Sequence, residues 1–355
     1  AIPDPGLPLP IGISFFTFQS MSYTIDLYRR NIKVQKNFID FAAFVTMFPQ
    51  IVAGPIVRYE DVSAQLACRR IDLRSMSDGI TRFVCGMCKK VLIANSIGAL
   101  WTDVKAQDYA SMPAATAWLG IAAFTLQIYF DFSGYSDMAI GLGKMLGFDF
   151  PENFRYPYNS KSIAEFWRRW HITLGDWFKS YVYFPLGGSR GSTAATIRNT
   201  LIVWLLTGLW HGASWNFILW GLYYGVLIIL EKFVFRRLLE RTPSALRHIL
   251  TMLAVVFGWV IFEITSPASE LEFVKAMLGF GGSFANSFTI NALHNYAVTF
   301  IAAIAISTGI PLKICKKLPE KRADTLSLVG EAAGMTACIA CLVDSGYNPF
   351  LYFNF

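Results

Sequence analysis

Long apolar stretches separated by short basic segments dominate the pattern of this chain. A helix needs about 20 apolar residues to cross the hydrocarbon core of a bilayer. Apolar spans can be drawn at roughly 11–25, 38–57, 78–101, 114–130, 134–148, 199–230, 247–264, 296–312 and 329–343. The pattern predicts an all-α, polytopic membrane protein that forms a single domain over residues 1–355.

The span 199–230 is too long for one upright helix. It runs for 32 residues without Asp, Glu, Lys or Arg, which as a helix would measure about 48 Å at ~1.5 Å per residue. The hydrocarbon core is only about 30 Å thick. We expect a strong tilt, a kink, or two pieces broken around "GLWHGASW". His211 then lies deep within a membrane segment.

Other spans contain breaks or carboxylates. Proline and glycine at Phe48-Pro49 and Gly54-Pro55 indicate re-entrant or protein-buried pieces that line a cavity, because lipid-exposed backbone must satisfy its own hydrogen bonds. Asp131 and Asp137 stand at the joint between two apolar pieces, and neither should face lipid. We expect them to cap a helix or, as the functional alternative, to line a polar tunnel.

Composition strengthens the membrane assignment. Hydrophobic residues make up 54% of the chain and charged residues 15%, with a mean hydropathy of +0.42, whereas soluble domains carry about 25% charged residues. The net charge of +7 comes from short basic clusters between spans, as the positive-inside bias produces. No continuous basic face or recognition motif is present, which excludes nucleic-acid binding.

The segment "SKSIAEFWRRWHITLGDWFKSYVYFP" predicts an amphipathic helix. Ser162 and Glu165 form the S-x-x-E capping pattern at its start, and we expect the helix to end near Pro185. Its aromatic face would carry His171 and its other face the charged residues. Such a helix suits a membrane interface or the wall of a wet cavity.

Two histidines are candidate functional residues. His211 is the sharper one, because an ionisable side chain inside a lipid-length uncharged run is costly and by default functional. Its structural alternative is helix packing through Gly208 and Gly212, which are four residues apart. For His171 the structural alternative is a ring whose nitrogens bond to backbone.

Metal binding has little support in the sequence. Zinc needs a third protein ligand beside two histidines, and the candidates, Cys85-x-x-Cys88 and Cys338-x-x-Cys341, lie inside apolar spans. We therefore expect no metal site and interpret these cysteines as small packing residues.

The turn "YFPLGGSRG" after the predicted helix has two interpretations. It is either a structural glycine turn, or a site where Lys179, Arg190 and the amides of Gly187 and Gly188 meet the phosphates of an anionic acyl donor. No nucleotide-hydrolysis or dinucleotide fingerprint occurs. A proton-coupled transporter is the alternative functional class, but the sequence has no internal repeat to favour it.

Four stretches together resemble the membrane-bound O-acyltransferase family, nearest to its alginate-acetylating branch. They are "PIGISFFTFQSMSYTIDLYRR", "DFSGYSDMAIGLGKMLGF", "NFRYPYNSKSIAEFWRRWHITLGDWFKSYVYFPLGGSRG" and "LTGLWHGASWNFILWGLYYG", with similarity from about residue 8 to the terminal "NPFLYFNF". The resemblance implies many helices around a funnel or tunnel, with re-entrant and interfacial helices. Members of this branch begin with several hydrophobic helices before "PIGISFFTF", so we expect this chain to lack them.

The resemblance also implies the chemistry. The family's near-invariant histidine falls on His211 and a second polar position on His171. We expect His211 to act as general base on an attacking hydroxyl, and His171 to orient the acceptor or to stabilise the oxyanion. The donor would be acetyl-CoA or another acyl thioester, with no tightly bound cofactor.

The acceptor would be a secreted polysaccharide or a periplasmic acetyl-transfer partner protein, reached from the bacterial cytoplasmic (inner) membrane. D-alanyl transfer to teichoic acid and peptidoglycan O-acetylation remain alternatives within the enzyme class, because the same geometry would serve them.

Overall fold

The computed structural model describes residues 12–52, 54–315 and 317–344, and helices make up all the regular structure in these ranges. This confirms the expected all-α fold. The terminal "NPFLYFNF" lies outside the described residues. The elements are α1 Ile13–Tyr28, α2 Phe38–Thr46, α3 Phe48–Ile51, α4 Tyr59–Ala67, α5 Leu73–Cys88, η1 Lys89–Ala94, α6 Asn95–Lys105, η2 Tyr109–Ser111, α7 Ala114–Met145, η3 Pro157–Asn159, α8 Ile163–Trp167, α9 Ile172–Phe178, η4 Lys179–Tyr183, α10 Thr193–His211, α11 Trp215–Phe233, α12 Arg236–Arg241, α13 Ser244–Glu263, α14 Pro267–Met277, α15 Ser287–Ser307, α16 Ile310–Cys315 and α17 Glu320–Asp344.

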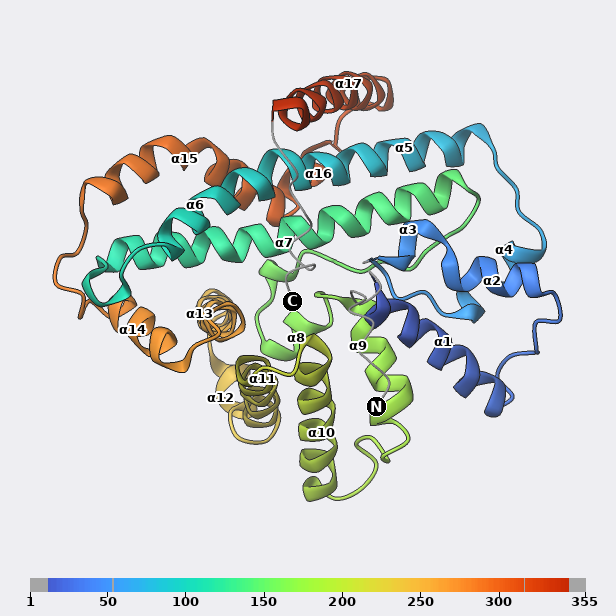
Figure 1. The fold of residues 1–355 in the computed structure, drawn as a ribbon, viewed down its shortest axis with the longest axis horizontal. Coiled ribbons are helices and arrows are strands. Elements are labelled where there is room, and N and C mark those ends of the chain that lie inside the picture. Colours follow the sequence, from blue (N-terminus) through green and yellow to red (C-terminus); the bar gives the residue numbers. More distant parts are fainter. Residues whose placement is uncertain (1–11, 53, 316, 345–355) are drawn as a thin grey trace, which may run out of the picture.

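Helix α7 forms the centre of the fold. The continuous helix made by α5, η1 and α6 runs along it, and α17 packs on the outer side of α5 (Figure 1). The pair α10–α11 lies on the other side, with α8 and α9 beside it (Figure 1).

Five helical segments within the described residues are long and apolar enough to cross a membrane. They are Leu73–Lys105, Trp215–Phe233, Ser244–Glu263, Ser287–Ser307 and Lys321–Asp344. Each overlaps a span expected from the sequence, so the chain is a multi-pass membrane protein.

The two expected spans 114–130 and 134–148 are in fact one helix. Helix α7 continues for 32 residues through Gly134, so the expected joint is absent and the expectation that Asp131 and Asp137 cap a helix was wrong. Asp137 instead pairs with Lys89 and with Arg82, whose Nη2 lies 2.6 Å from Oδ1. Asp131 pairs with Lys90 at 2.5 Å. The carboxylates therefore tie α7 to α5 and η1.

Close backbone approach explains why this interface is rich in glycine. A Cβ added to Gly134 would lie 2.7 Å from the carbonyl oxygen of Gly86. A side chain at either position would push α5 away from α7. One cysteine of each pair packs here: the sulfurs of Cys88 and Cys338 lie 3.8 Å apart between α5 and α17, both thiols are free, and Cys85 and Cys341 are exposed.

The remaining breaks occur where the sequence placed them. The span 38–57 divides into α2, α3 and an extended stretch in which Ile56 and Val57 are buried. The span 199–230 divides into α10 and α11 at Gly212, whose φ is 156°. Gly208 does serve helix packing, since a Cβ there would lie 2.4 Å from the carbonyl oxygen of Phe217 on α11.

The predicted single helix from Ser162 to Pro185 was wrong. Ser162 does cap its start by accepting a hydrogen bond from the Glu165 amide at 3.0 Å. However, α8 ends at Trp167 and α9 begins only at Ile172, because His171 adopts a left-handed backbone with φ 43°. A kink therefore separates the two halves and turns the histidine inward.

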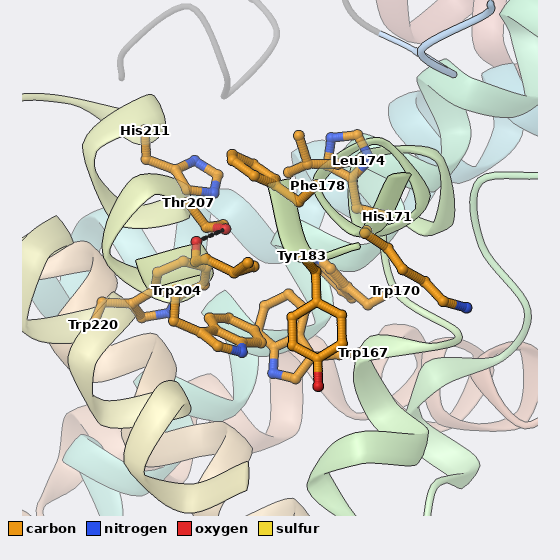
Figure 2. A pocket seen from close by; sticks show the side chains of 13 residues that line it. Trp167, Trp170, His171, Leu174, Phe178, Tyr183, Trp204, Thr207, His211 and Trp220 are labelled. Atoms are coloured by element: carbon orange, nitrogen blue, oxygen red, sulfur yellow. Dashed lines mark hydrogen bonds between the residues drawn. The ribbon is translucent and has the colours of Figure 1, made fainter. Parts of the chain in front are cut away.

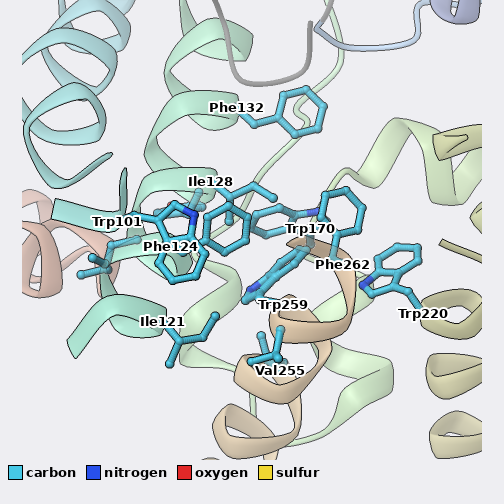
Figure 3. Packing of buried hydrophobic residues seen from close by; sticks show 14 of the residues in the cluster. Trp101, Ile121, Phe124, Ile128, Phe132, Trp170, Trp220, Val255, Trp259 and Phe262 are labelled. Carbon is cyan, nitrogen blue, oxygen red and sulfur yellow. The ribbon is translucent and has the colours of Figure 1, made fainter. Parts of the chain in front are cut away.

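Aromatic side chains fill the centre of the fold. Figure 3 shows Trp170, Trp259 and Phe262 packed between α7 and the α10–α11 pair. Trp170 and Trp259 have ring centroids 4.8 Å apart, and both rings are buried. This packing fixes the position of the kinked segment that carries His171.

Candidate active site

One partly open cavity brings the two candidate histidines together. It has a volume of about 190 Å³, and its lining includes His171, His211, Trp167, Trp220 and Lys179. Figure 2 shows the histidines at one end, from the kink before α9 and from the end of α10 respectively. Segments 40 residues apart in the sequence thus line the same space.

The ring of Trp210 lies in contact with both histidines. Its centroid is 6.0 Å from that of His171 and 4.9 Å from that of His211. Phe15 packs edge-on against Trp210, with ring centroids 5.6 Å apart, and stacks with His171, with ring centroids 6.3 Å apart. Aromatic rings therefore surround the end of the cavity and hold the histidines in an apolar setting.

The aromatic face of the kinked segment turns toward α10 and α11. Trp167 packs edge-on against Trp204 and Trp220, with ring centroids 4.8 Å and 5.4 Å away. Leu174 also lines the cavity. The interface between α8–α9 and α10–α11 is thus built from indole rings.

Asn153 determines which nitrogen of His171 carries the proton. Its Oδ1 lies 3.4 Å from the amide nitrogen of Thr173, which can only donate, and its Nδ2 lies 3.4 Å from the carbonyl oxygen of Gly54, which can only accept. These two contacts fix the orientation of the side-chain amide. Since Nδ1 of His171 lies 3.0 Å from the same Oδ1, Nδ1 must be the donor.

The remaining ring nitrogen of His171 is then an acceptor. In a neutral imidazole with the proton on Nδ1, Nε2 keeps its lone pair. Nε2 is buried and has no hydrogen-bond partner within the described structure, and the side chain is 3% exposed. Burial lowers the pKa of His171 well below its ordinary range, and nearby His211 lowers it further. The ring is therefore neutral at neutral pH.

The backbone of His171 is strained to reach this position. A left-handed conformation is uncommon for a residue with a side chain, and such outliers occur often at functional sites. Here the amide of the next residue, Ile172, donates to the carbonyl oxygen of Asn153 at 3.0 Å. Asn153 thus holds both the backbone and the ring at the kink.

His211 is the last residue of α10. Gly212 follows it, and the rings of Trp220 and Phe262 pack edge-on against the imidazole with centroids 5.0 Å and 5.2 Å away. The helix break therefore places the histidine at the cavity end between α10 and α11. A break around "GLWHGASW" was one of the outcomes expected from the sequence, and His211 lies directly before it.

The glycine turn packs against the outer ends of α10 and α11. Gly187 and Gly188 both have positive φ. Asn199 on α10 donates to the carbonyl oxygen of Gly188 at 3.0 Å, and Lys232 on α11 donates to the hydroxyl of Ser189 at 3.1 Å. These contacts support the structural interpretation of the turn.

The two basic residues proposed for phosphate binding are placed differently. Lys179 lines the cavity, and its Nζ lies 5.7 Å from the Phe184 ring centroid. Arg190 is exposed on the turn and is not among the cavity-lining residues.

A second, more polar cavity, which the sequence did not predict, lies beside η4. Its volume is about 520 Å³, and Arg29 and Arg58 line it together with Tyr181. Both guanidinium carbons lie 5.4 Å from the Tyr181 ring centroid, and both side chains donate to Ser180. Arg29, which follows α1, and Arg58, which precedes α4, therefore meet at Ser180 and Tyr181 of η4.

Asn153 is a residue of this site that the sequence did not indicate. It lies in the quoted segment "NFRYPYNS", but it precedes His171 by 18 residues and no local pattern links the two. Its complete burial is the property that marks it, because a buried amide must find partners. The described residues hold no group of three His, Cys, Asp or Glu side chains placed to bind a metal.

Comparison with known proteins gives a consistent result. A sequence profile described as the membrane-bound O-acyltransferase family matches residues 16–269. The chain is 48% identical over 273 residues to the probable alginate O-acetylase AlgI of Pseudomonas aeruginosa, covering 77% of this chain and 52% of that protein. It is 35% identical over 306 residues to the peptidoglycan O-acetyltransferase of Helicobacter pylori, covering 78% and 58%.

A more distant match is the teichoic acid D-alanyltransferase of Bacillus subtilis, with 28% identity over 278 residues, 71% of this chain and 68% of that protein. The chain spans about half the length of the AlgI proteins that it matches.

Proposed function

This chain belongs to the membrane-bound O-acyltransferase family, and on that premise we propose that it transfers an acetyl group from a thioester donor toward hydroxyls of a secreted polysaccharide. The observation that carries the proposal is the shared apolar cavity of His171 and His211. Two imidazoles lining one apolar cavity, one of them held neutral, suit proton removal from a hydroxyl. The name of the AlgI relatives supports an alginate-like acceptor.

In the proposed reaction, His211 removes the proton of the attacking hydroxyl as general base. The hydroxyl oxygen forms a bond to the thioester carbonyl carbon, the carbon–sulfur bond breaks, and the thiolate leaves and takes up the proton. The indole rings that line the cavity would limit the access of water, which competes with the acceptor for the acyl group.

The fixed tautomer of His171 supports one of its two expected roles over the other. A neutral ring with its proton on Nδ1 has no N–H to offer at Nε2, so it cannot stabilise an oxyanion from that side. It can accept a hydrogen bond from a second hydroxyl of the acceptor. We therefore assign His171 to orienting the acceptor, since sugar polymers present neighbouring hydroxyls.

The basic residues support a cytoplasmic donor. Lys179, Arg190 and Lys232 belong to one end of the fold, where η4, the glycine turn and the end of α11 meet. Positive residues collect on the cytoplasmic side of bacterial inner-membrane proteins. Acetyl-CoA or a carrier-bound thioester would place its phosphates near Lys179 and Arg190, with Arg29 and Arg58 beside them.

A proton-coupled transporter is less well supported. The pairs of Asp131 and Asp137 with lysine and arginine are the kind of intramembrane charge that pumps use. None of these residues lines the cavity of the two histidines. They connect α7 to α5 and η1, which suits a structural role.

The test measures acyl transfer by the purified protein in nanodiscs. Acetyl-CoA, a D-alanyl thioester or no donor is supplied, and each condition is combined with a polysaccharide, teichoic acid or peptidoglycan acceptor. The proposal expects acetyl transfer to the polysaccharide, directly or through an added periplasmic partner. Transfer of D-alanine alone, or of acetyl to peptidoglycan alone, would replace it by one of the alternatives.

A further inference from the structure

A second apolar groove shares no lining residue with the reaction cavity. It lies between α11, α12 and α13, which are neighbours in Figure 1, and has a volume of about 280 Å³. Its apolar wall consists of Leu227, Leu230, Phe235, Leu238, Leu239 and Leu250. Leu238 is 63% exposed and Leu250 is 49% exposed, so the groove opens to the surroundings of the helices.

One cationic side chain lines this apolar groove without a partner. The Nε of Arg247 is buried and makes no hydrogen bond, and Arg247 forms no ion pair with any described residue. An unsatisfied buried donor on a charged group is unfavourable. Within the described residues, the protein therefore supplies no acceptor for this buried Nε–H group.

The surroundings of Arg247 favour an anion that carries a hydrocarbon chain. Helix α12, with the sequence RRLLER, carries Arg237 and Arg241 next to the leucines that form part of the wall, whereas Arg236 pairs with Glu240. Glu231 also lines the groove, but both its oxygens are engaged by the amides of Ile163 and Ala164 at 2.6 Å and 3.2 Å. Positive charge above an apolar slot matches a phospholipid headgroup above its acyl chain.

We propose that this groove binds an anionic phospholipid, with its phosphate on Arg247 and one acyl chain along the leucine wall. The site touches the start of the segment that carries His171. Glu231 holds the first amides of α8, and the adjacent His248 donates from Nδ1 to the carbonyl oxygen of Ser160 at 2.9 Å. A bound lipid would therefore pack against the elements that anchor α8. The inference does not depend on the proposed reaction.

The experiment measures lipid binding to the purified protein by native mass spectrometry and by the shift of its unfolding temperature. Phosphatidylglycerol is compared with phosphatidylcholine of the same chains. We expect wild type to prefer phosphatidylglycerol by about tenfold, the size of one charge-assisted hydrogen bond. Equal binding of both lipids would overturn the proposal.

Matched variants distinguish lipid binding at this groove from general attraction to positive surface charge. Arg247→Gln should abolish the preference, and Arg247→Lys should retain part of it. Arg236→Gln is the control, because Arg236 is 75% exposed and pairs with Glu240, and it should keep the preference. Equal loss in Arg236→Gln and Arg247→Gln would show diffuse attraction and contradict the site.

A further variant tests the chain-binding wall. Leu238→Gln on the exposed rim should weaken phosphatidylglycerol binding without unfolding the protein. Soluble glycerol phosphate should not displace the lipid. Displacement by glycerol phosphate would indicate a free-phosphate site and would contradict the need for an acyl chain.

Discussion

Asn153 and His171 form a hydrogen bond of 3.0 Å in which the amide oxygen can only accept and the imidazole Nδ1 must donate. This bond leaves Nε2 of His171 as a buried acceptor at the end of the cavity. The pair therefore links a residue in the loop after α7 to the chemistry available at the kink between α8 and α9.

Replacing Asn153 by alanine should lower activity more than protein abundance. His171 would lose its Nδ1 partner and become free to change tautomer. We expect a loss of acetyl transfer on the order of 10- to 100-fold, the range seen when the hydrogen-bond partner of a metal-binding histidine is removed. Gln50→Ala is the control, since Gln50 is an equally buried amide bonded to the Phe44 carbonyl.

A pH profile distinguishes positioning from simple structural support. Asn153→Asp would place a carboxylate on Nδ1 of His171 and favour the protonated ring, so activity at acid pH should fall in this variant relative to wild type. An unchanged pH profile in Asn153→Asp would contradict the positioning role.

The burial of neutral His171 should make stability depend on pH. Its pKa is lowered in the folded protein, so the unfolded chain binds one more proton once the pH falls below about 6.5. The free energy of unfolding therefore includes a stabilising contribution from the neutral ring above that pH. This contribution is lost as the pH falls, by up to ~1.4 kcal/mol per pH unit. Unfolding temperatures between pH 7 and 5 should fall less steeply for His171→Gln than for wild type. Parallel curves would exclude this contribution.

Lys179→Ala and Arg190→Ala should weaken use of a phosphate-bearing donor. Each removes one charge near the proposed phosphate position, so the KM for acetyl-CoA should rise by roughly fivefold per residue. The KM for S-acetyl-pantetheine, which has no phosphate, should stay the same. Equal changes with both donors, or none with either, would leave the glycine turn with a structural role alone.

The ion pairs of α7 should matter for folding rather than for catalysis. Asp137→Asn would leave Lys89 without its carboxylate partner in a largely buried position, where Asp137 is 12% exposed, while Arg82 would keep its pair with Glu152. Loss of one partner from a buried pair costs about 3–5 kcal/mol, and the remaining Arg82–Glu152 pair together with the partial exposure of the site should reduce this to ~1–3 kcal/mol. The variant should unfold at a lower temperature, yet the remaining folded protein should keep its specific activity. A normal melting temperature with lost activity would instead indicate a role in transport or catalysis.

The sequence predicted features that depend on local pattern. Uncharged length located the spans, and the length limit of a bilayer predicted the break near Gly212. The Ser162 cap was also visible, because it depends on a residue three positions away. These features follow from neighbouring residues alone.

Long-range contacts explain what the sequence did not predict. The kink at His171 depends on Asn153, and the straight course of α7 through Asp131 and Asp137 depends on partners from α5 and η1. Apolar periodicity cannot show such partners. The sequence around the two carboxylates therefore looked like a joint between two helices. The segment around His171 looked like one continuous helix.

The acetyl content of the polymer made by cells carrying His211→Ala tests the central claim most directly. The claim is that the cavity between His171 and His211 is where acyl transfer occurs, and loss of a general base lowers a rate by about 10²- to 10⁴-fold. His294→Ala is the matched control, since His294 lies exposed on α15. We expect His211→Ala to accumulate in the membrane like wild type while polymer acetylation disappears, and the His294→Ala polymer to be normally acetylated. Near-normal acetyl content with His211→Ala would contradict the claim.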